Sequence, residues 1–462
     1  MKRIQKYGRA FEWRLSRAHG EAREPVRRAL IDLSRSERLE ILEDYLYLSR
    51  KRHKSTLALA KVQLHLLEDL AVAQRAVKNL REHKERLTAS LPGAKGGERT
   101  RLESDLEDAE RGLFFERHLA NCIRLVGDGI AWRSLGYDRA ALRLLSERST
   151  KQEILSDGLR AELAEWSHVL DTGQGLAIYN AVTNCLAFGD VTIVRDDGSV
   201  EVVEVKSSNT KSRRITRQKQ GMNRVVELLK AGEGDSQEGE RVSVLSVDLE
   251  PENKLRDLLK LLQEASQCGF AAGPISNFLY VECVDFRSAK DFEKVKADLN
   301  AARQKYIKPW EERDDLFVPM DSADFVAFTP NCAPFSVFPF PEEICVGLIT
   351  GAERFMSFLN ESEVAREFER RGWQVIIGPD DVRRQAQELH EKGEEFNLDC
   401  ILRVKKDGFS MDVPPGEFTR LTMEMVRPKV LIKAREMIRA LGRGATEGPV
   451  LLTFAREHEV WR

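Results

Sequence analysis

A regular series of apolar residues constrains the fold of this chain more than any other feature of its sequence. The steps alternate near three and four residues, and Lys84 breaks one position. The series consists of Leu59, Val62, Leu66, Leu70, Ala73, Val77, Leu80, Leu87 and Leu91. Such spacing is typical of the narrow seam of a coiled coil rather than the broad apolar face of a globular helix. The series ends at Pro92-Gly93, and the segment PGAKGGERT predicts a turn.

A second helix is expected to begin near Thr100. Its apolar face would be formed by Leu102, Leu106, Ala109 and Leu113. Two helices joined by a short glycine-rich turn predict an antiparallel helical hairpin over about 56–115. The hairpin could serve as a spacer or in dimerisation. We expect a homodimer or higher oligomer through these N-terminal helices.

Composition excludes several classes of protein. The net charge of -2 means that any nucleic-acid binding must come from local patches. The seven cysteines form no CxxC pair and the eight histidines form no HxxxH or HExxH motif, so we expect neither a disulfide framework nor a histidine-bound zinc site. Without an apolar signal segment or a run of about 18 apolar residues, a cytoplasmic protein with no membrane contact is predicted.

The 462 residues exceed what one core usually spans, so more than one domain is expected. We place a helical region at 1–118, an α/β domain at 119–290 and an α+β region of unknown role at 291–462. In the last region, KDFEKVKADLNAARQKYI and RPKVLIKAREMIRALG predict helices. REFERRGWQVIIGPDD predicts a helix, a turn and a strand, and LDCILRVKKDGFSMDV predicts a hairpin.

The central domain changes from helical to strand periodicity near residue 172. A helix is followed by the strands LAIYNAV, DVTIV and VEVVEVK, then by the helix ITRQKQGMNRVVELLKAG and the strand RVSVLSVDL. The order predicts an α/β domain with a mixed sheet. Earlier in the chain, Gly127-Asp128-Gly129 predicts a turn. Because no GxxxxGK[ST] or GxGxxG motif is present, nucleotide hydrolysis is not expected.

The stretch GDVTIVRDDGSVEVVEVKSS carries Asp190, Glu204 and Lys206 in a strand-forming context. Charged residues are poor strand formers and are costly to bury unless they are paired or bound to metal. Since side chains alternate along a strand, Glu204 and Lys206 share one face. A three-residue loop over 196–198 would pair Asp190 with Glu204 on that face, and Gly198 would occupy its left-handed position. A bulge elsewhere could produce the same convergence.

Two carboxylates and a lysine on paired strands have a defined chemical use. Carboxylate oxygens bind Mg²⁺, which keeps several waters and accepts phosphate oxygens. The metal polarises a phosphoryl group and lowers the pKa of a bound water, and a lysine can orient that water. The reaction expected of such a site is hydrolysis of a phosphodiester.

Asp190, the hairpin and Glu204-Val205-Lys206 together resemble the PD-(D/E)xK superfamily of restriction-endonuclease-like nucleases. The resemblance covers about residues 150–285 and implies an αβββαβ core. It implies that Asp190 and Glu204 bind Mg²⁺ or Mn²⁺, that the main-chain carbonyl of Val205 is a further ligand, and that Lys206 is the catalytic lysine. Gly189 stands where the family usually has proline.

Further site residues are implied by the same resemblance. Gln220 is the candidate for the glutamine that many members carry on the following helix, with Gln218 close to it. The QxxxY pattern of one branch is not met, because Arg224 stands at the fourth position after Gln220. A glutamate on the first core helix could be either Glu162 or Glu165, and the sequence leaves both open.

A run of positive charge follows the ExK motif. The segment from Lys206 to Val225 has seven basic residues and no acidic one, namely Lys206, Lys211, Arg213, Arg214, Arg217, Lys219 and Arg224. A run of positive charge beside a carboxylate site is typical of a surface that contacts a phosphate backbone. The alternative is a basic helix that is exposed to solvent and binds no nucleic acid.

The sequence therefore predicts a metal-dependent deoxyribonuclease that acts on DNA, in a setting such as bacterial restriction, repair or antiviral defence that the resemblance alone suggests. A non-catalytic nucleic-acid-binding scaffold assembled through the coiled coil is the alternative. RNA as the substrate is a third hypothesis, although no RNA-recognition motif is present.

Overall fold

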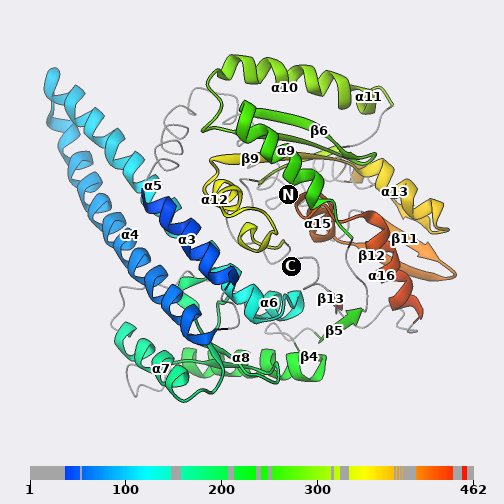
Figure 1. Cartoon of the computed structure of the whole chain (residues 1–462), viewed down its shortest axis with the longest axis horizontal. Coiled ribbons are helices and arrows are strands. Elements are labelled where there is room, and N and C mark those ends of the chain that lie inside the picture. The colour runs from blue at the N-terminus through cyan, green and yellow to red at the C-terminus, as the bar shows by residue number, and fades with distance from the viewer. Residues whose placement is uncertain are drawn as a thin grey trace.

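The computed structural model describes residues 37–51, 55–146, 158–205, 213–235, 241–247, 252–313, 317–322, 332–378, 402–440 and 450–454, with single positions between 381 and 388. Within these ranges the chain is a mixed α/β structure. A long helical hairpin stands beside several small sheets and the helices that cover them (Figure 1).

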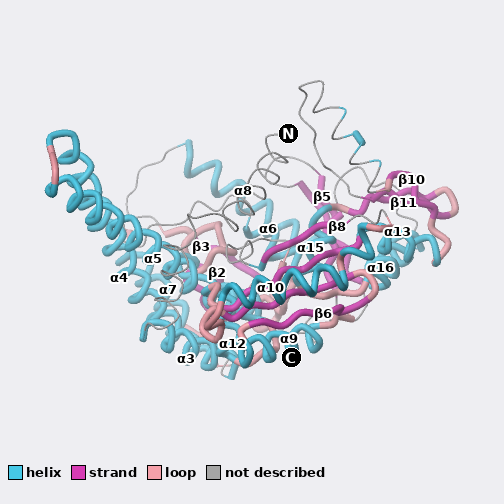
Figure 2. The backbone as a smooth tube through the Cα atoms, turned by 90° about the horizontal axis from the view of Figure 1, so that it is seen from above, coloured by secondary structure: helices cyan, strands magenta, loops and turns pink. Residues whose placement is uncertain are grey.

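The expected hairpin is formed by α4 (Thr56–Ser90) and α5 (Gly97–Ser134), and α3 (Glu37–Lys51) packs at its base. Ser55 caps α4 by accepting the backbone N–H of Ala58. Most of the expected seam is buried, from Leu59 to Ala73 and again at Leu87. Lys84, the break in the series, pairs with Glu110 of α5 at 2.6 Å. Figure 2 shows that the outer half of the hairpin projects beyond the rest of the molecule.

The inner part of α5 enters the main core. The helix continues without interruption past residue 118, where the helical region was expected to end and the α/β domain to begin. The prediction of a turn at Gly127-Asp128-Gly129 is wrong, because all three residues lie inside α5 and are buried. A Cβ atom at Gly127 would lie 2.0 Å from the carbonyl oxygen of Val182, and one at Gly129 would lie 2.7 Å from Oγ of Ser336. Tight tertiary packing, not a turn, accounts for these glycines.

The segment from residue 158 to 247 contains the expected helix, three strands, helix and strand in that order, together with two elements that were not expected, η2 and β4. It contains α7 (Leu159–Asp171), β1 (Leu176–Tyr179), the short 3-10 helix η2 (Asn180–Val182), β2 (Val191–Val194), β3 (Val200–Val203), α8 (Arg213–Ala231), β4 (Glu233–Asp235) and β5 (Arg241–Val247). Strands β1, β2 and β3 form an antiparallel sheet in that order. Strand β5 pairs instead with β4 and, in parallel, with β13 (Val450–Phe454), so the described strands do not form one four-stranded core sheet.

A second, larger sheet has the order β6-β7-β9-β8. Its strands are β6 (Phe270–Ser276), β7 (Leu279–Asp285), β8 (Phe317–Asp321) and β9 (Glu353–Asn360). The helices around it are α9 (Leu255–Cys268), α10 (Phe292–Tyr306), α11 (Lys308–Glu311), α12 (Glu342–Thr350) and α15 (Pro415–Met423), with the 3-10 helix η4 (Phe335–Val337). Strand β6 was not expected from the sequence.

The C-terminal elements largely follow the sequence prediction. Helix α13 (Glu361–Arg370) leads through a turn into β10 (Gln374–Ile377), β11 (Leu402–Lys406) and β12 (Phe409–Val413) form the expected hairpin, and α16 (Pro428–Ala440) is the expected helix. Asp407 and Gly408 both have positive φ, as a two-residue hairpin turn requires.

One large apolar cluster joins the base of the hairpin, the β1–β3 sheet and the β6–β9 sheet. A buried ion network lies within this region. The carboxylate of Glu424 is fully buried and accepts Arg139 Nη2 at 2.7 Å, Arg420 Nε at 3.1 Å and the N–H of Ala333 at 2.7 Å. Burial alone would raise the pKa of Glu424, but the two guanidinium groups hold it below its usual range.

The six described cysteines are free thiols, and five of them are buried. None of the described helices combines the length and apolar character needed to cross a membrane.

Candidate functional site

The β2–β3 hairpin has the register that its turn chemistry predicts. Val191 pairs with Val203 and Val194 with Val200, and the N–H of Arg195 donates to the carbonyl oxygen of Ser199. Three residues, 196–198, therefore remain in the loop. Gly198 has φ of 79°, which is the left-handed conformation that the closing position requires. The expected three-residue loop is confirmed.

This register brings Asp190, directly before β2, to the same end of the hairpin as Glu204, directly after β3. The N–H of Asp190 donates to the carbonyl oxygen of Val203 at 2.8 Å. Its carboxylate Oδ2 accepts the N–H of Val205 at 2.6 Å. Because that N–H belongs to the peptide bond between Glu204 and Val205, the Asp190 carboxylate lies directly against the backbone of the ExK motif.

The geometry also explains the glycine at position 189. Gly189 has φ of 63°, and a Cβ atom there would lie 2.6 Å from the carbonyl oxygen of Val203. Proline fixes φ at about -65° and could not adopt the positive φ of residue 189. The conformation of this loop therefore requires glycine at position 189.

Asn180 fixes the backbone around Asp190. Its N–H donates to the carbonyl oxygen of Asp190 at 3.0 Å, and its Nδ2 donates to the carbonyl oxygen of Phe188 at 2.6 Å. Its Oδ1 accepts the hydroxyl of Thr192 at 2.9 Å. A single buried amide thus connects the loop before β2 with β2 itself, and Asp190 is only 8% exposed between them.

Tyr179 brings one of the two candidate glutamates of α7 toward the site. Its hydroxyl donates to Oε2 of Glu162 at 2.6 Å, and its ring is buried. Burial, the hydrogen bond to Glu162 and the nearby charge of Asp190 all raise the pKa of Tyr179, which stays protonated. The structure thus places Glu162, rather than Glu165, in hydrogen-bond contact with Tyr179, the residue directly before Asn180. Tyr179 and Asn180 belong to no sequence motif, so neither could be predicted as a residue of this site.

The structure describes only some of the remaining predicted residues. Glu204 and Val205 are half-buried, and Gln220 and Arg224 are exposed on α8, which packs against β3 and turns Val225 and Leu228 inward. Lys206 and Lys211 lie outside the described residues. The backbones of Arg213, Arg214, Arg217, Gln218 and Lys219 belong to α8, but their side chains lie outside the described part.

The described residues near Asp190 provide oxygen atoms of the kind that bind a divalent cation. Among the described side chains, no group of three or more His, Cys, Asp or Glu residues is arranged to hold a metal ion. Asp190 and Glu204 supply two carboxylates at the same end of the β2–β3 hairpin, and the backbone of Val205 contacts the Asp190 carboxylate through its N–H. Hard oxygens of this kind are the donors that Mg²⁺ and Mn²⁺ prefer, and such an ion needs few protein ligands because it retains waters.

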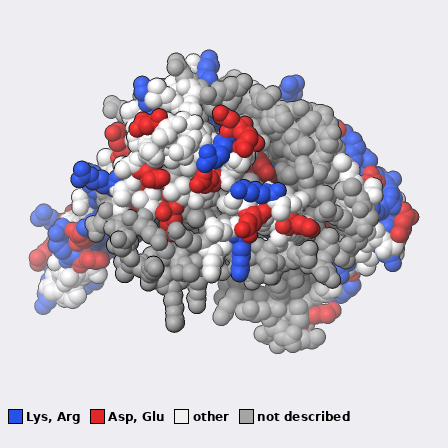
Figure 3. Space-filling view, turned by 90° about the horizontal axis from the view of Figure 1, so that it is seen from below, with Lys and Arg blue, Asp and Glu red and all other residues white. Residues whose placement is uncertain are grey.

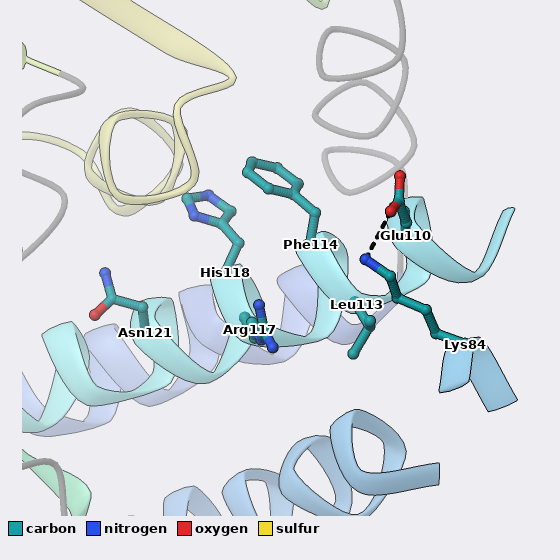
Figure 4. A pocket seen from close by; sticks show the side chains of 7 residues that line it. All are labelled: Lys84, Glu110, Leu113, Phe114, Arg117, His118 and Asn121. Atoms are coloured by element: carbon teal, nitrogen blue, oxygen red, sulfur yellow. Dashed lines mark ion pairs between the residues drawn. The ribbon is translucent and has the colours of Figure 1, made fainter. Parts of the chain in front are cut away.

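The described surface offers no single-sign patch on the face drawn in Figure 3, where acidic and basic side chains are interspersed. A pocket of about 400 Å³ lies on the hairpin (Figure 4). Phe114 and His118 point to the same side of α5 there, with parallel rings 5.9 Å apart. His118 Nε2 lies 2.7 Å from the carbonyl oxygen of Thr350, and burial lowers its pKa. None of the candidate site residues lines this pocket.

Comparison of the chain with protein-family models, curated proteins and solved structures found no match. The assignment of a function therefore depends on the residues and their geometry.

Proposed function

We propose that this protein is a metal-dependent nuclease of the restriction-endonuclease-like kind, and that it hydrolyses phosphodiester bonds of DNA. The observation that carries the proposal is the contact between the Asp190 carboxylate and the peptide bond between Glu204 and Val205. The contact supports the pairing of an upstream aspartate with an ExK motif, which otherwise occurs by chance in many half-exposed hairpins.

Each residue has a defined role in this proposal. Asp190 and Glu204, with the carbonyl group of Val205, would hold Mg²⁺ or Mn²⁺, which supplies a Lewis acid for the phosphoryl group and lowers the pKa of a bound water. Lys206 would orient the attacking water and neutralise charge that develops on the phosphate oxygens. The burial of Asp190 keeps its carboxylate in one place, and Asn180 holds its backbone.

DNA binding is assigned to the basic segment and to α8. Lys211, Arg213, Arg214, Arg217, Lys219 and Arg224 would contact the phosphate backbone. Gln220, one helical turn before Arg224, would lie on the substrate side of α8. Since these contacts are ionic, binding should weaken steeply as salt increases.

The test is cleavage of supercoiled plasmid, linear duplex, single-stranded DNA and RNA, with Mg²⁺, Mn²⁺ or EDTA. We expect metal-dependent cutting that Lys206→Ala and Glu204→Gln reduce by about a thousandfold or more. Glu201→Gln is the matched control, because Glu201 lies on β3, three residues before Glu204, and pairs with Arg195 instead of Asp190. Equal activity of the Glu204 and Glu201 variants would refute the site.

The second candidate function is a non-catalytic nucleic-acid-binding scaffold. It is favoured by the helical hairpin of α4 and α5, which projects beyond the rest of the molecule (Figure 2). Mn²⁺ titration by calorimetry distinguishes the two. A nuclease should bind Mn²⁺ in the wild type and not in a variant with both Asp190→Asn and Glu204→Gln. A scaffold should bind it in neither.

A further inference from the structure

The outer edge of β1 is closed by a side chain instead of another strand. In the β1-β2-β3 sheet, β1 is an edge strand. Gln63 of α4, which is 1% exposed, accepts the N–H of Tyr179 at 2.8 Å and donates Nε2 to the carbonyl oxygen of Ala177 at 3.1 Å. One buried amide thus makes the two hydrogen bonds that a neighbouring strand would make, and Nε1 of Trp166 on α7 also donates to the carbonyl oxygen of Ala177 at 3.1 Å.

The other arm of the hairpin binds the segment that follows β1. On α5, Asp128 is fully buried and accepts the N–H of Asn184 at 2.6 Å, the N–H of Cys185 at 2.9 Å and Asn184 Nδ2 at 3.1 Å. One turn earlier, Nε of Arg124 donates to the carbonyl oxygen of Ala181 at 3.3 Å. Between them lies Gly127, which allows close contact with Val182.

These contacts reach Asp190 by a short route. Tyr179, whose N–H is bound by Gln63, is followed directly by Asn180, whose N–H is bound to the carbonyl group of Asp190. Tyr179 also holds Glu162 through its hydroxyl. Hydrogen bonds therefore connect α4 with Tyr179, at one end of the β1–β2 connection, and through Asn180 with the backbone of Asp190 at the other end.

We propose that Gln63, Arg124 and Asp128 are positioning residues of the candidate nuclease site, through which the helical hairpin holds Asp190 against the ExK motif. The proposal rests on the proposed function. None of the three contacts substrate. They act through the backbone of residues 177–185, and a displacement of about 1 Å at a reacting group can reduce a rate by about a hundredfold.

Two substitutions of Gln63 test this directly. Gln63→Met keeps the length of the side chain and removes both hydrogen bonds. Gln63→Glu accepts from Tyr179 when ionised but can donate to Ala177 only when protonated. The activity of Gln63→Glu relative to wild type should therefore increase as the pH falls from 8 to 5.5, whereas that of Gln63→Met should not.

The control for loss of stability is Leu70→Ala, because Leu70 is buried in the same helix and contributes by apolar packing. Melting temperatures and kcat and KM are measured for all variants. We expect kcat of Gln63→Met to fall by about tenfold or more with KM nearly unchanged. A fall no larger than that of Leu70→Ala, at equal loss of stability, would overturn the proposal.

Amide hydrogen exchange provides a measurement that does not require activity. The N–H of Val205 is bonded to Asp190, so its exchange reports the position of that carboxylate. In Gln63→Met and Asp128→Asn it should exchange about tenfold faster, while the N–H groups of β7 are unchanged. Retained protection of Val205 would overturn the positioning role. If wild type cuts no substrate, the proposed function fails, and Val205 exchange alone decides whether the hairpin positions Asp190.

Discussion

Replacing Glu353 by glutamine should make the stability of the protein less dependent on pH. Glu353 begins β9 and is 1% exposed, and its Oε1 lies 2.9 Å from Nη2 of Arg287. It lines a polar cavity of about 580 Å³, and Asp285 and Glu343 line the same cavity. Burial raises the pKa of Glu353 from 4.5 to about 8, against the opposing effect of Arg287 and with a further increase from Asp285.

The sign and size of the effect follow from this pKa. Because the folded protein holds the proton more tightly than the unfolded chain, the stabilisation is fully present below pH 4.5 and is lost as the pH rises through 8. Each unit in this window corresponds to about 1.4 kcal/mol. Between pH 6 and pH 9, wild type should therefore lose about 3 kcal/mol of unfolding free energy through this group. Glu353→Gln, which has no proton to lose, should not show that loss.

Urea denaturation at pH 6, 7, 8 and 9 measures the difference. The free energy of the variant relative to wild type should shift by about 3 kcal/mol in favour of the variant over this range. Glu343→Gln is the matched control, since Glu343 borders the same cavity but is exposed. Parallel curves for wild type and Glu353→Gln would refute the reasoning, because they would mean that Glu353 does not carry the raised pKa.

Three further substitutions test other parts of the structure. Glu424→Gln should reduce the free energy of unfolding by about 3 to 5 kcal/mol in urea titrations, because it leaves Arg139 and Arg420 buried without their shared carboxylate; a loss below about 1 kcal/mol would contradict this. Gly127→Ala should lower the melting temperature and release the segment around Val182, since the new Cβ atom would overlap the carbonyl oxygen. An unchanged melting temperature would show that the helix and this segment are not in close contact. Gly189→Ala should cost about 2 kcal/mol or more and abolish Mn²⁺ binding at Asp190, because it meets both a positive φ and the backbone of Val203; calorimetry with unchanged metal affinity would argue against this placement of the loop.

The sequence predicted correctly those elements whose structure is determined by residues close together in the chain. The hairpin seam could be predicted because its spacing is sustained and ends at Pro92-Gly93. The β2–β3 register could be predicted because a three-residue loop with Gly198 in its left-handed position is a common hairpin connection and places Asp190 and Glu204 on one face. The two-residue turn at Asp407-Gly408 has an equally strong local signal.

Elements determined by distant contacts could not be predicted in this way. Gly127-Asp128-Gly129 has the composition of a turn, but these glycines lie inside a helix, where the close approach of Val182 and Ser336 leaves no room for a Cβ atom. Strand β6 contains Gly273 and Pro274, which usually exclude a strand, but β6 is an edge strand and tolerates them. The parallel pairing of β5 with β13 joins segments about 200 residues apart and leaves no local signal.

The candidate site shows the same division. Asp190 and Glu204 could be paired from alternation and loop length alone. The choice between Glu162 and Glu165 required the hydroxyl of Tyr179, which comes from a different element. Gln63 was beyond sequence analysis, because it lies in a coiled-coil helix more than 100 residues from the strand that it closes.

The length of the helical hairpin can change without changing the contacts at its inner end. Helix α4 has 35 residues and is about 50 Å long, and Gln63 lies near its inner end. On α5, Arg124 and Asp128 also lie near the inner end. Seven residues removed from the outer part of each arm would shorten its reach by about 10 Å and keep the seam in phase. Removing three or four from one arm alone would rotate that seam out of register. Evolution could therefore lengthen or shorten this arm in matched heptads, and so alter how far the protein reaches without altering the geometry around Asp190.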